Sequence, residues 1–229
     1  MVHSGSMAAL IIFDLDGTII DSRRDLADST NEMLATYGAP ALPIEQVAAM
    51  VGEGARVLVE RALLASGLPP AASDALPRFL AIYDRRLLRH TRPYAGIAPV
   101  VRLAAARAAL AVLTNKPEAL SRRILEAFDL RPCFRWVIGG DASFPRKPDP
   151  ASVRFLMTEA GATPAGTLLV GDSAIDVETA TRAGVRVCVA RYGFGRIDPD
   201  GLPAGADVAA TPGEVGAAIA RFLDAGGRG

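Results

Sequence analysis

Short apolar runs, separated by segments with helical periodicity, dominate the pattern of hydrophobic and polar positions along the chain. Continuous apolar runs of this length, without alternation, are typical of strands buried on both faces. These predicted strands are 10–13, 110–113, 136–138, 168–170 and 185–189. Helices are predicted near 118–128, 150–160, 174–183 and 213–225. The alternation predicts an α/β fold, a doubly wound (Rossmann-like) parallel sheet covered on both faces.

A long interval separates the first predicted strand from the second, and a structureless loop of that length is implausible in a compact domain. The interval carries three amphipathic helical patterns, marked by Leu26, Met33 and Leu34, by Val57, Leu58 and Leu64, and by Phe79, Ile82 and Tyr83. Prolines break the segments between these patterns. We therefore expect residues 22–92 to form an inserted α-helical cap domain, with residues 7–21 and 93–229 as the catalytic core.

The polar residues after the first strand are the most informative chemical feature. Asp14 and Asp16 are followed by Gly17, which ends the strand. Residues i and i+2 of an extended segment point the same way, and parallel sheets bind ligands at the carboxyl ends of their strands. Two adjacent carboxylates repel unless a cation or a held proton offsets the repulsion. The pair predicts metal-assisted nucleophilic and acid/base chemistry.

Two further clusters provide donors for an anion. Thr114 and Asn115 follow the second strand, and the helix start opened by Pro117 offers backbone N–H groups. By itself, Thr114 would more often be a helix cap. Lys147 lies among prolines and would by itself indicate a solvated surface charge. However, Lys116 and Lys147 are the only lysines among the 25 basic residues, which suggests a need for a compact ammonium at both places.

The last cluster follows the strand 168–170, where Asp172 and Ser173 precede a predicted helix that carries Asp176. A helix N-cap role for Asp172 or Ser173 is compatible with metal binding nearby. Asp14, Asp16 and Asp172 would supply the hard oxygen ligands that suit Mg²⁺. One carboxylate would remain free to attack, and carboxylates are known nucleophiles in phosphoryl transfer.

In this order, the four motifs resemble those of the haloacid dehalogenase superfamily of phosphohydrolases. The resemblance spans nearly the whole chain after Met7. It implies that Asp14 attacks phosphorus and also binds Mg²⁺. It implies that Asp16 protonates the leaving oxygen, then activates the hydrolytic water, and contacts the metal through its backbone carbonyl. Asp172 would bind the metal directly.

The same resemblance assigns the remaining motif residues to the substrate phosphate and to the outer shell of the metal. Thr114, Asn115 and Lys147 would hold the phosphoryl oxygens. Asp176 would act on the metal directly or through water in the outer shell, and Ser173 would lie in that shell. Phosphoryl transfer depends mostly on positioning and charge stabilisation, which a cation, an ammonium and backbone donors provide.

The helical interval resembles the cap of bacterial phosphoglycolate phosphatases, which implies 2-phosphoglycolate as the substrate. Gly52, Glu53 and Gly54 form the matching loop, although Glu53 stands where many such enzymes carry Asn. Arg56 could supply the positive charge that a carboxylate needs, or it could be a solvated residue of the helix face. The loop residues and Arg56 are therefore candidate substrate contacts.

The same residues argue for or against the other activities known in the superfamily. A dehalogenase would not need the acid at Asp16, and a phosphonoacetaldehyde hydrolase would need a cap lysine, which residues 22–92 lack. A mutase is disfavoured because its cap recognition pattern is not evident. A sugar-phosphate phosphatase, for example one for N-acetylmuramate 6-phosphate, and a pyrophosphatase remain open. The intact motifs argue against a regulatory module without catalysis.

The composition limits the class of partner and the cellular compartment that we expect. The 25 acidic and 25 basic residues give a formal net charge of zero, which argues against nucleic-acid partners. No apolar stretch is long enough to span a bilayer. Cys133 and Cys188 suit core packing in a reducing cytoplasm. We expect a cytoplasmic monomer or homodimer acting on a small phosphorylated substrate, with residues 1–6 a remnant of the expression vector.

Overall fold

The structure, a computed structural model, describes residues 9–70, 74–195, 197 and 201–226, so the expected vector remnant at 1–6 lies outside the described residues. A six-stranded sheet has the order β5-β4-β1-β6-β7-β8, and every neighbouring pair is parallel. Its strands are β1 (Leu10–Phe13), β4 (Ala109–Leu113), β5 (Trp136–Ile138), β6 (Thr167–Gly171), β7 (Arg186–Ala190) and β8 (Asp207–Ala209). The central position of β1, between β4 and β6, places the residue after it in the middle of the sheet edge.

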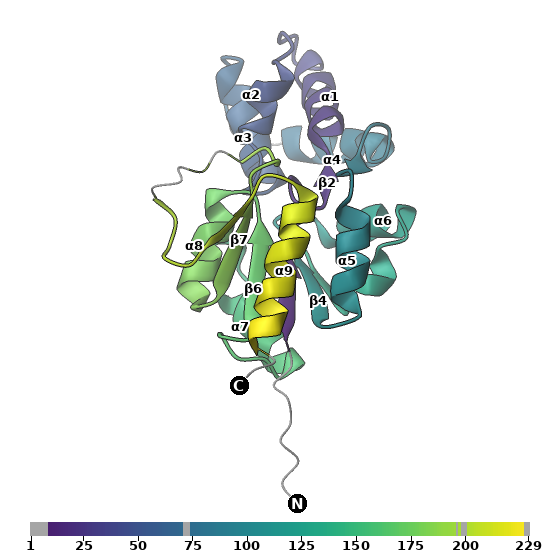
Figure 1. Cartoon of the computed structure of the whole chain (residues 1–229). Helices are drawn as coiled ribbons and strands as arrows, with labels where there is room; N and C mark the ends of the chain where they lie inside the picture. Colours follow the sequence, from purple (N-terminus) through teal and green to yellow (C-terminus); the bar gives the residue numbers. More distant parts are fainter. Residues whose placement is uncertain (1–8, 71–73, 196, 198–200, 227–229) are drawn as a thin grey trace, which may run out of the picture.

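Helices cover both faces of this sheet, which confirms the predicted α/β fold (Figure 1). Side chains alternate along β1, so Ile11 and Phe13 pack into one apolar cluster and Leu10 and Ile12 into the other. The first cluster is covered by α5 (Ile97–Ala105), α6 (Glu118–Ala127) and α9 (Pro212–Gly226), and the second by α7 (Ala151–Ala160) and α8 (Ala174–Ala183). A short 3₁₀ turn, η1 (Arg131–Cys133), precedes β5.

The interval between β1 and β4 begins with a group of helices, here called the helical insert. It comprises α1 (Arg23–Ala35), α2 (Ile44–Ala48), α3 (Ala55–Ala65) and α4 (Ala75–Arg86), grouped beyond one end of the sheet in Figure 1. An antiparallel ribbon of β2 (Ile20–Asp21) and β3 (Arg92–Pro93) connects both ends of the insert to the core. That the insert is a separate domain over 22–92 stays a prediction.

The buried carboxylate of Asp25 fixes the base of the insert to its return segment. Asp25 is fully buried in α1 and accepts hydrogen bonds from the backbone N–H groups of His90 and Thr91 and from Thr91 Oγ1. Such charge-assisted bonds are among the stronger ones in proteins. They hold the start of α1 and the end of the insert together. Across the described ranges, no helix is long and apolar enough to cross a bilayer.

Candidate active site

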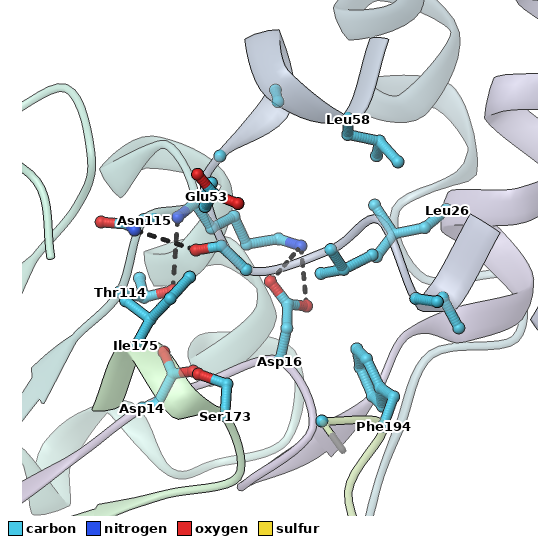
Figure 2. A pocket seen from close by; sticks show the side chains of 18 of the residues that line it. Asp14, Asp16, Leu26, Glu53, Leu58, Thr114, Asn115, Ser173, Ile175 and Phe194 are labelled. Atoms are coloured by element: carbon cyan, nitrogen blue, oxygen red, sulfur yellow. Dashed lines mark hydrogen bonds and ion pairs between the residues drawn. The ribbon is translucent and has the colours of Figure 1, made fainter. Parts of the chain in front are cut away.

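The site lies where three neighbouring strands end. Asp14 follows β1, Thr114 follows β4 and Asp172 follows β6, and these strands are adjacent in the sheet. Parallel strands therefore deliver all three side chains to one edge, as the sequence predicts. A cavity of about 450 Å³ opens there, lined by these residues and by α1, α3 and α4 of the insert (Figure 2).

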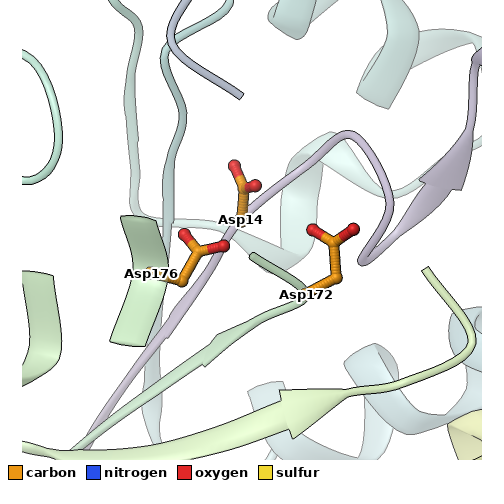
Figure 3. A group of neighbouring side chains, drawn as sticks. All are labelled: Asp14, Asp172 and Asp176. Atoms are coloured by element: carbon orange, nitrogen blue, oxygen red, sulfur yellow. The ribbon is translucent and has the colours of Figure 1, made fainter. Parts of the chain in front are cut away.

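Asp14, Asp172 and Asp176 form a buried carboxylate triad (Figure 3). One oxygen of each lies within 4.8 Å of the others. Burial raises the pKa of Asp14 to about 6 and that of Asp172 to about 8, and the neighbouring carboxylates add to both effects. The triad is thus strained electrostatically when all three groups are ionised.

Lys147 is the cation of this cluster. Its ammonium nitrogen lies 2.6 Å from Asp176 Oδ1 and 2.9 Å from Asp14 Oδ1, and the side chain is only 3% exposed. Burial would lower the pKa of Lys147, but the two carboxylates outweigh burial and raise it above its usual range. Lys147 therefore stays protonated, and three ionised carboxylates still exceed it by two negative charges.

The donor set fits a hard divalent cation. Asp14 Oδ1 is buried beside Lys147, yet no hydrogen-bond donor among the described residues is aligned with it. The triad offers carboxylate oxygens alone, and neither histidine nor cysteine belongs to this group in the described part of the chain. Carboxylates of this kind are the ligands of Mg²⁺ and related ions, and a divalent charge would offset the excess.

The three carboxylates differ in how far their oxygens are already used. Asp176 Oδ1 accepts from Lys147, and its Oδ2 accepts from the N–H and hydroxyl of Ser173. Ser173 is also the N-cap of α8, in a reciprocal capping box with Asp176. Asp172 Oδ2 accepts the N–H groups of Phe194 and Gly195, each at 2.9 Å. Asp172 Oδ1 accepts a long contact of 3.5 Å from Thr18 Oγ1, so the oxygens of Asp176 are the most fully used of the three carboxylates.

The Asp16 carboxylate is not part of the triad. Both of its oxygens accept from Lys116 Nζ, at 2.9 and 3.0 Å, and Oδ1 also accepts from Ser22 Oγ at 2.5 Å. Lys116 Nζ further donates to Tyr83 Oη of α4 at 2.5 Å. The Asp16 side chain thus belongs to a separate ion pair. Metal contact through the Asp16 carbonyl stays a prediction.

The sequence marks Lys116 as one of two lysines but does not place it at Asp16. Its side chain is 4% exposed, and burial, which would lower its pKa, is outweighed by Asp16 and Tyr83, which raise it. Burial raises the pKa of Tyr83 to about 12, so its hydroxyl stays neutral. The scarcity of lysine in the chain was the one available signal for Lys116.

The two polar residues after β4 have different surroundings. Thr114 is buried, and its Oγ1 accepts the N–H of Lys116, which leaves the hydroxyl hydrogen available to donate. The Asn115 amide donates to the carbonyls of Gly52 and Lys147 and accepts the N–H of Lys147. Asn115 therefore links the insert to the Lys147 loop, while its contact with a substrate phosphate stays a prediction.

The candidate residues of the insert separate into two groups. Gly52, Glu53 and Gly54 line the cavity, whereas Arg56 is exposed and is not among the lining residues. The insert's arginine at the cavity wall is Arg61, which the sequence alone does not mark as a substrate contact. Arg61 forms an ion pair with Glu53. Gly52 has φ of 126° and Gly54 has φ of 95°, values that favour glycine and allow the loop its close approach to Asn115.

The comparisons with known proteins agree with this geometry. The family model for haloacid dehalogenase-like hydrolases matches residues 11–190. Phosphoglycolate phosphatase 1 of Pseudomonas aeruginosa is 42% identical over 192 residues, which are 81% of this chain and 70% of the relative. Phosphoglycolate phosphatase of Rhodospirillum rubrum is 43% identical over 198 residues, covering 83% of this chain and 82% of the relative. The crystal structure of a predicted phosphoglycolate phosphatase from Haemophilus somnus 129pt is similar with a TM-score of 0.85 and 30% identity, covering 91% of this chain and 96% of that one.

Proposed function

Because the chain belongs to the haloacid dehalogenase-like hydrolases, we propose that it is a magnesium-dependent phosphatase that hydrolyses 2-phosphoglycolate to glycolate and phosphate. One observation carries the phosphatase chemistry. The carboxylate of Asp14 lies at the end of the central strand, 2.9 Å from the ammonium of Lys147, and it lines the cavity. A nucleophile beside a fixed cation suits attack on an anionic phosphoryl group.

In the proposed first half-reaction, an Asp14 oxygen forms a bond to phosphorus as the bond from phosphorus to the glycolate oxygen breaks. Asp16, in its protonated form, gives its proton to that oxygen, so glycolate leaves with a neutral hydroxyl group and an aspartyl-phosphate remains. To act as the acid, Asp16 must release at least one of its contacts with Lys116 and Ser22. Lys147 and Thr114 hold the phosphoryl oxygens during the transfer.

In the second half-reaction, Asp16 takes a proton from a water molecule, and the water oxygen attacks phosphorus. The bond between phosphorus and Asp14 breaks, which restores the carboxylate and releases inorganic phosphate. The helical insert acts as a cap in this proposal, because its residues line the cavity and would exclude bulk water when they close over the substrate.

The metal proposal assigns Asp14, Asp172 and the backbone carbonyl of Asp16 as ligands of Mg²⁺, with Asp176 and Ser173 in the outer shell. When bound, the ion would neutralise charge on the phosphoryl oxygens. The support is the buried triad with its excess negative charge and its oxygen-only donor set. Weak binding is expected, since Mg²⁺ keeps several waters at such sites.

The substrate part of the proposal rests on the relatives named phosphoglycolate phosphatase, at 42% and 43% identity over most of the chain. The test is phosphate release in MgCl₂ from 2-phosphoglycolate, N-acetylmuramate 6-phosphate, pyrophosphate and ethyl phosphate. We expect the highest kcat/KM for 2-phosphoglycolate, and loss of turnover in Asp14→Asn. A higher kcat/KM for one of the other three compounds would overturn the substrate assignment. Turnover near wild type in Asp14→Asn, checked for deamidation, would overturn the mechanism.

A further inference from the structure

The carboxylate of the proposed substrate needs a hydrogen-bond donor that is separate from the phosphate-binding groups, and a cationic side chain is the strongest such donor. Lys116 and Arg61 are the cationic side chains among the residues that line the cavity. Lys116 is nearly inaccessible and already contacts Asp16 and Tyr83. Arg61 is the more available of the two, because 42% of its side chain is exposed.

We propose that Arg61 is the residue that binds the substrate carboxylate, and that Glu53 occupies its guanidinium when no substrate is bound. This inference rests on the proposed function and names the specificity residue of that same site. Glu53 also lines the cavity and has a side chain that is 45% exposed, so it is free to move away.

The geometry around Arg61 supports this assignment. Helical side chains lean toward the N-terminus of their helix, so the guanidinium of Arg61 returns to the loop before α3. There Nη2 contacts the Glu53 carboxylate, and Nη1 donates to the Met50 carbonyl at 3.3 Å. The Met50 contact keeps the guanidinium at the cavity wall. The planar donor group therefore already holds a carboxylate, which is the chemistry that a carboxylate substrate requires.

Arg56 provides a matched control on the same helix. Five residues of an α-helix correspond to a rotation of about 140°, so Arg56 and Arg61 lie on different sides of α3. Arg56 is exposed and is not among the residues that line the cavity. Replacing either arginine by Gln removes one positive charge from the same helix. A general charge effect would therefore appear in both variants, and a specific contact in only one.

The experiment compares 2-phosphoglycolate with its carboxamide analogue, 2-phosphoglycolamide, which has nearly the same shape and lacks the carboxylate charge. Wild type is expected to prefer the carboxylate by about 10- to 100-fold in kcat/KM, the range of one charge-assisted interaction. Arg61→Gln should reduce that ratio to within about threefold of unity. Arg61→Lys should restore part of it, and Arg56→Gln should keep the wild-type ratio.

The Glu53 arm tests the second half of the proposal. Glu53→Gln should lower KM for 2-phosphoglycolate, because the substrate no longer competes with a carboxylate for Arg61. An unchanged or higher KM would show that Glu53 is not a competitor.

The outcomes separate this inference from the proposed function. If wild type prefers the carboxylate and Arg61→Gln keeps the preference, Arg61 is not the partner, and the backbone N–H groups at the start of α3 replace it. Equal losses of preference in Arg61→Gln and Arg56→Gln would also overturn the assignment. If wild type itself shows no preference for 2-phosphoglycolate, the substrate part of the proposed function fails. Turnover of the carboxamide shows in each variant that the site is folded.

Discussion

Replacing Asp172 by Asn is expected to stabilise the metal-free protein and to abolish turnover. The carboxylate is buried, and its Oδ2 accepts the N–H groups of Phe194 and Gly195. The Asn side chain has nearly the same shape as that of Asp, and its carbonyl oxygen can accept both hydrogen bonds. The substitution therefore removes a buried ionisable group without leaving those two donors unpaired, and it also removes a proposed metal ligand.

The magnitude follows from the raised pKa of Asp172. Burial, followed by the charges of Asp176 and Asp14, raises this pKa from 3.8 to about 8. Below pH 3.8 both the folded and the unfolded chain hold the proton. Between pH 3.8 and 8 the unfolded chain has released it and the folded protein has not, so each pH unit lowers the free energy of unfolding by about 1.4 kcal/mol. At pH 7 the loss is about 4 kcal/mol, a large part of a typical stability of about 5–15 kcal/mol.

The assay is thermal unfolding in EDTA from pH 4 to pH 8, for wild type and Asp172→Asn, with the exposed Asp129→Asn as a control. The stability of Asp172→Asn should fall less with pH, and at pH 7 its Tm should exceed that of wild type by about 10 °C. Adding MgCl₂ should raise the Tm of wild type more than that of Asp172→Asn. If the stabilities of wild type and Asp172→Asn change in parallel with pH in EDTA, the argument from desolvation is wrong.

Three further predictions concern the residues around this cluster. Gly17→Ala should lose about 2 kcal/mol or more of stability, seen in urea unfolding, because Gly17 has φ of 85° and a Cβ would lie 2.1 Å from Asp172 Oδ2; wild-type stability would contradict this. Asp16→Asn should slow phosphorylation by 2-phosphoglycolate about 100-fold or more, and by p-nitrophenyl phosphate far less, in rapid-quench trapping; equal slowing would show that Asp16 is not the acid. Lys116→Met should lower the free energy of unfolding in urea by about 3 kcal/mol, since it leaves Asp16 and Tyr83 without the ammonium that they contact. Tyr83→Phe removes one hydrogen bond and should lower it by about 1 kcal/mol. An equal cost for these last two variants would contradict the assigned role of Lys116.

The core strands could be predicted to within one residue at each end because their signal is local. Strands β4, β6 and β7 are apolar runs bounded by polar residues or glycine. Burial on both faces of the sheet requires that apolar composition. Their adjacency then places Asp14, Thr114 and Asp172 at one edge. The sequence pattern does not predict α5, which has Pro99 in its first turn, where proline is tolerated. It also does not predict β8, whose three residues are too few for a periodic signal.

The destinations of long side chains could not be predicted, because they depend on packing between segments far apart in the chain. Lys116 stands two residues from Thr114, but its ammonium contacts Asp16 and Tyr83, one from each side of the cavity. The choice between Arg56 and Arg61 depends on which side of α3 faces the core. Leu58, Val59, Ala62 and Leu63 are buried along α3, and the apolar pattern alone does not say whether they pack on the sheet or on other helices.

Two consecutive residues of the core contact the insert, and the second of them also contacts the proposed acid. Asn115 donates to the Gly52 carbonyl in the loop before α3, and Lys116 donates to Tyr83 of α4 and to Asp16. Arg61 donates to the Met50 carbonyl in the same loop that Asn115 contacts at Gly52. A carboxylate bound at Arg61 would therefore act on the position of this loop. Binding energy from the part of the substrate that does not react would thereby position both the insert and Asp16. Because interactions of that kind act in the transition state, a substrate without the carboxylate should lose kcat as well as affinity.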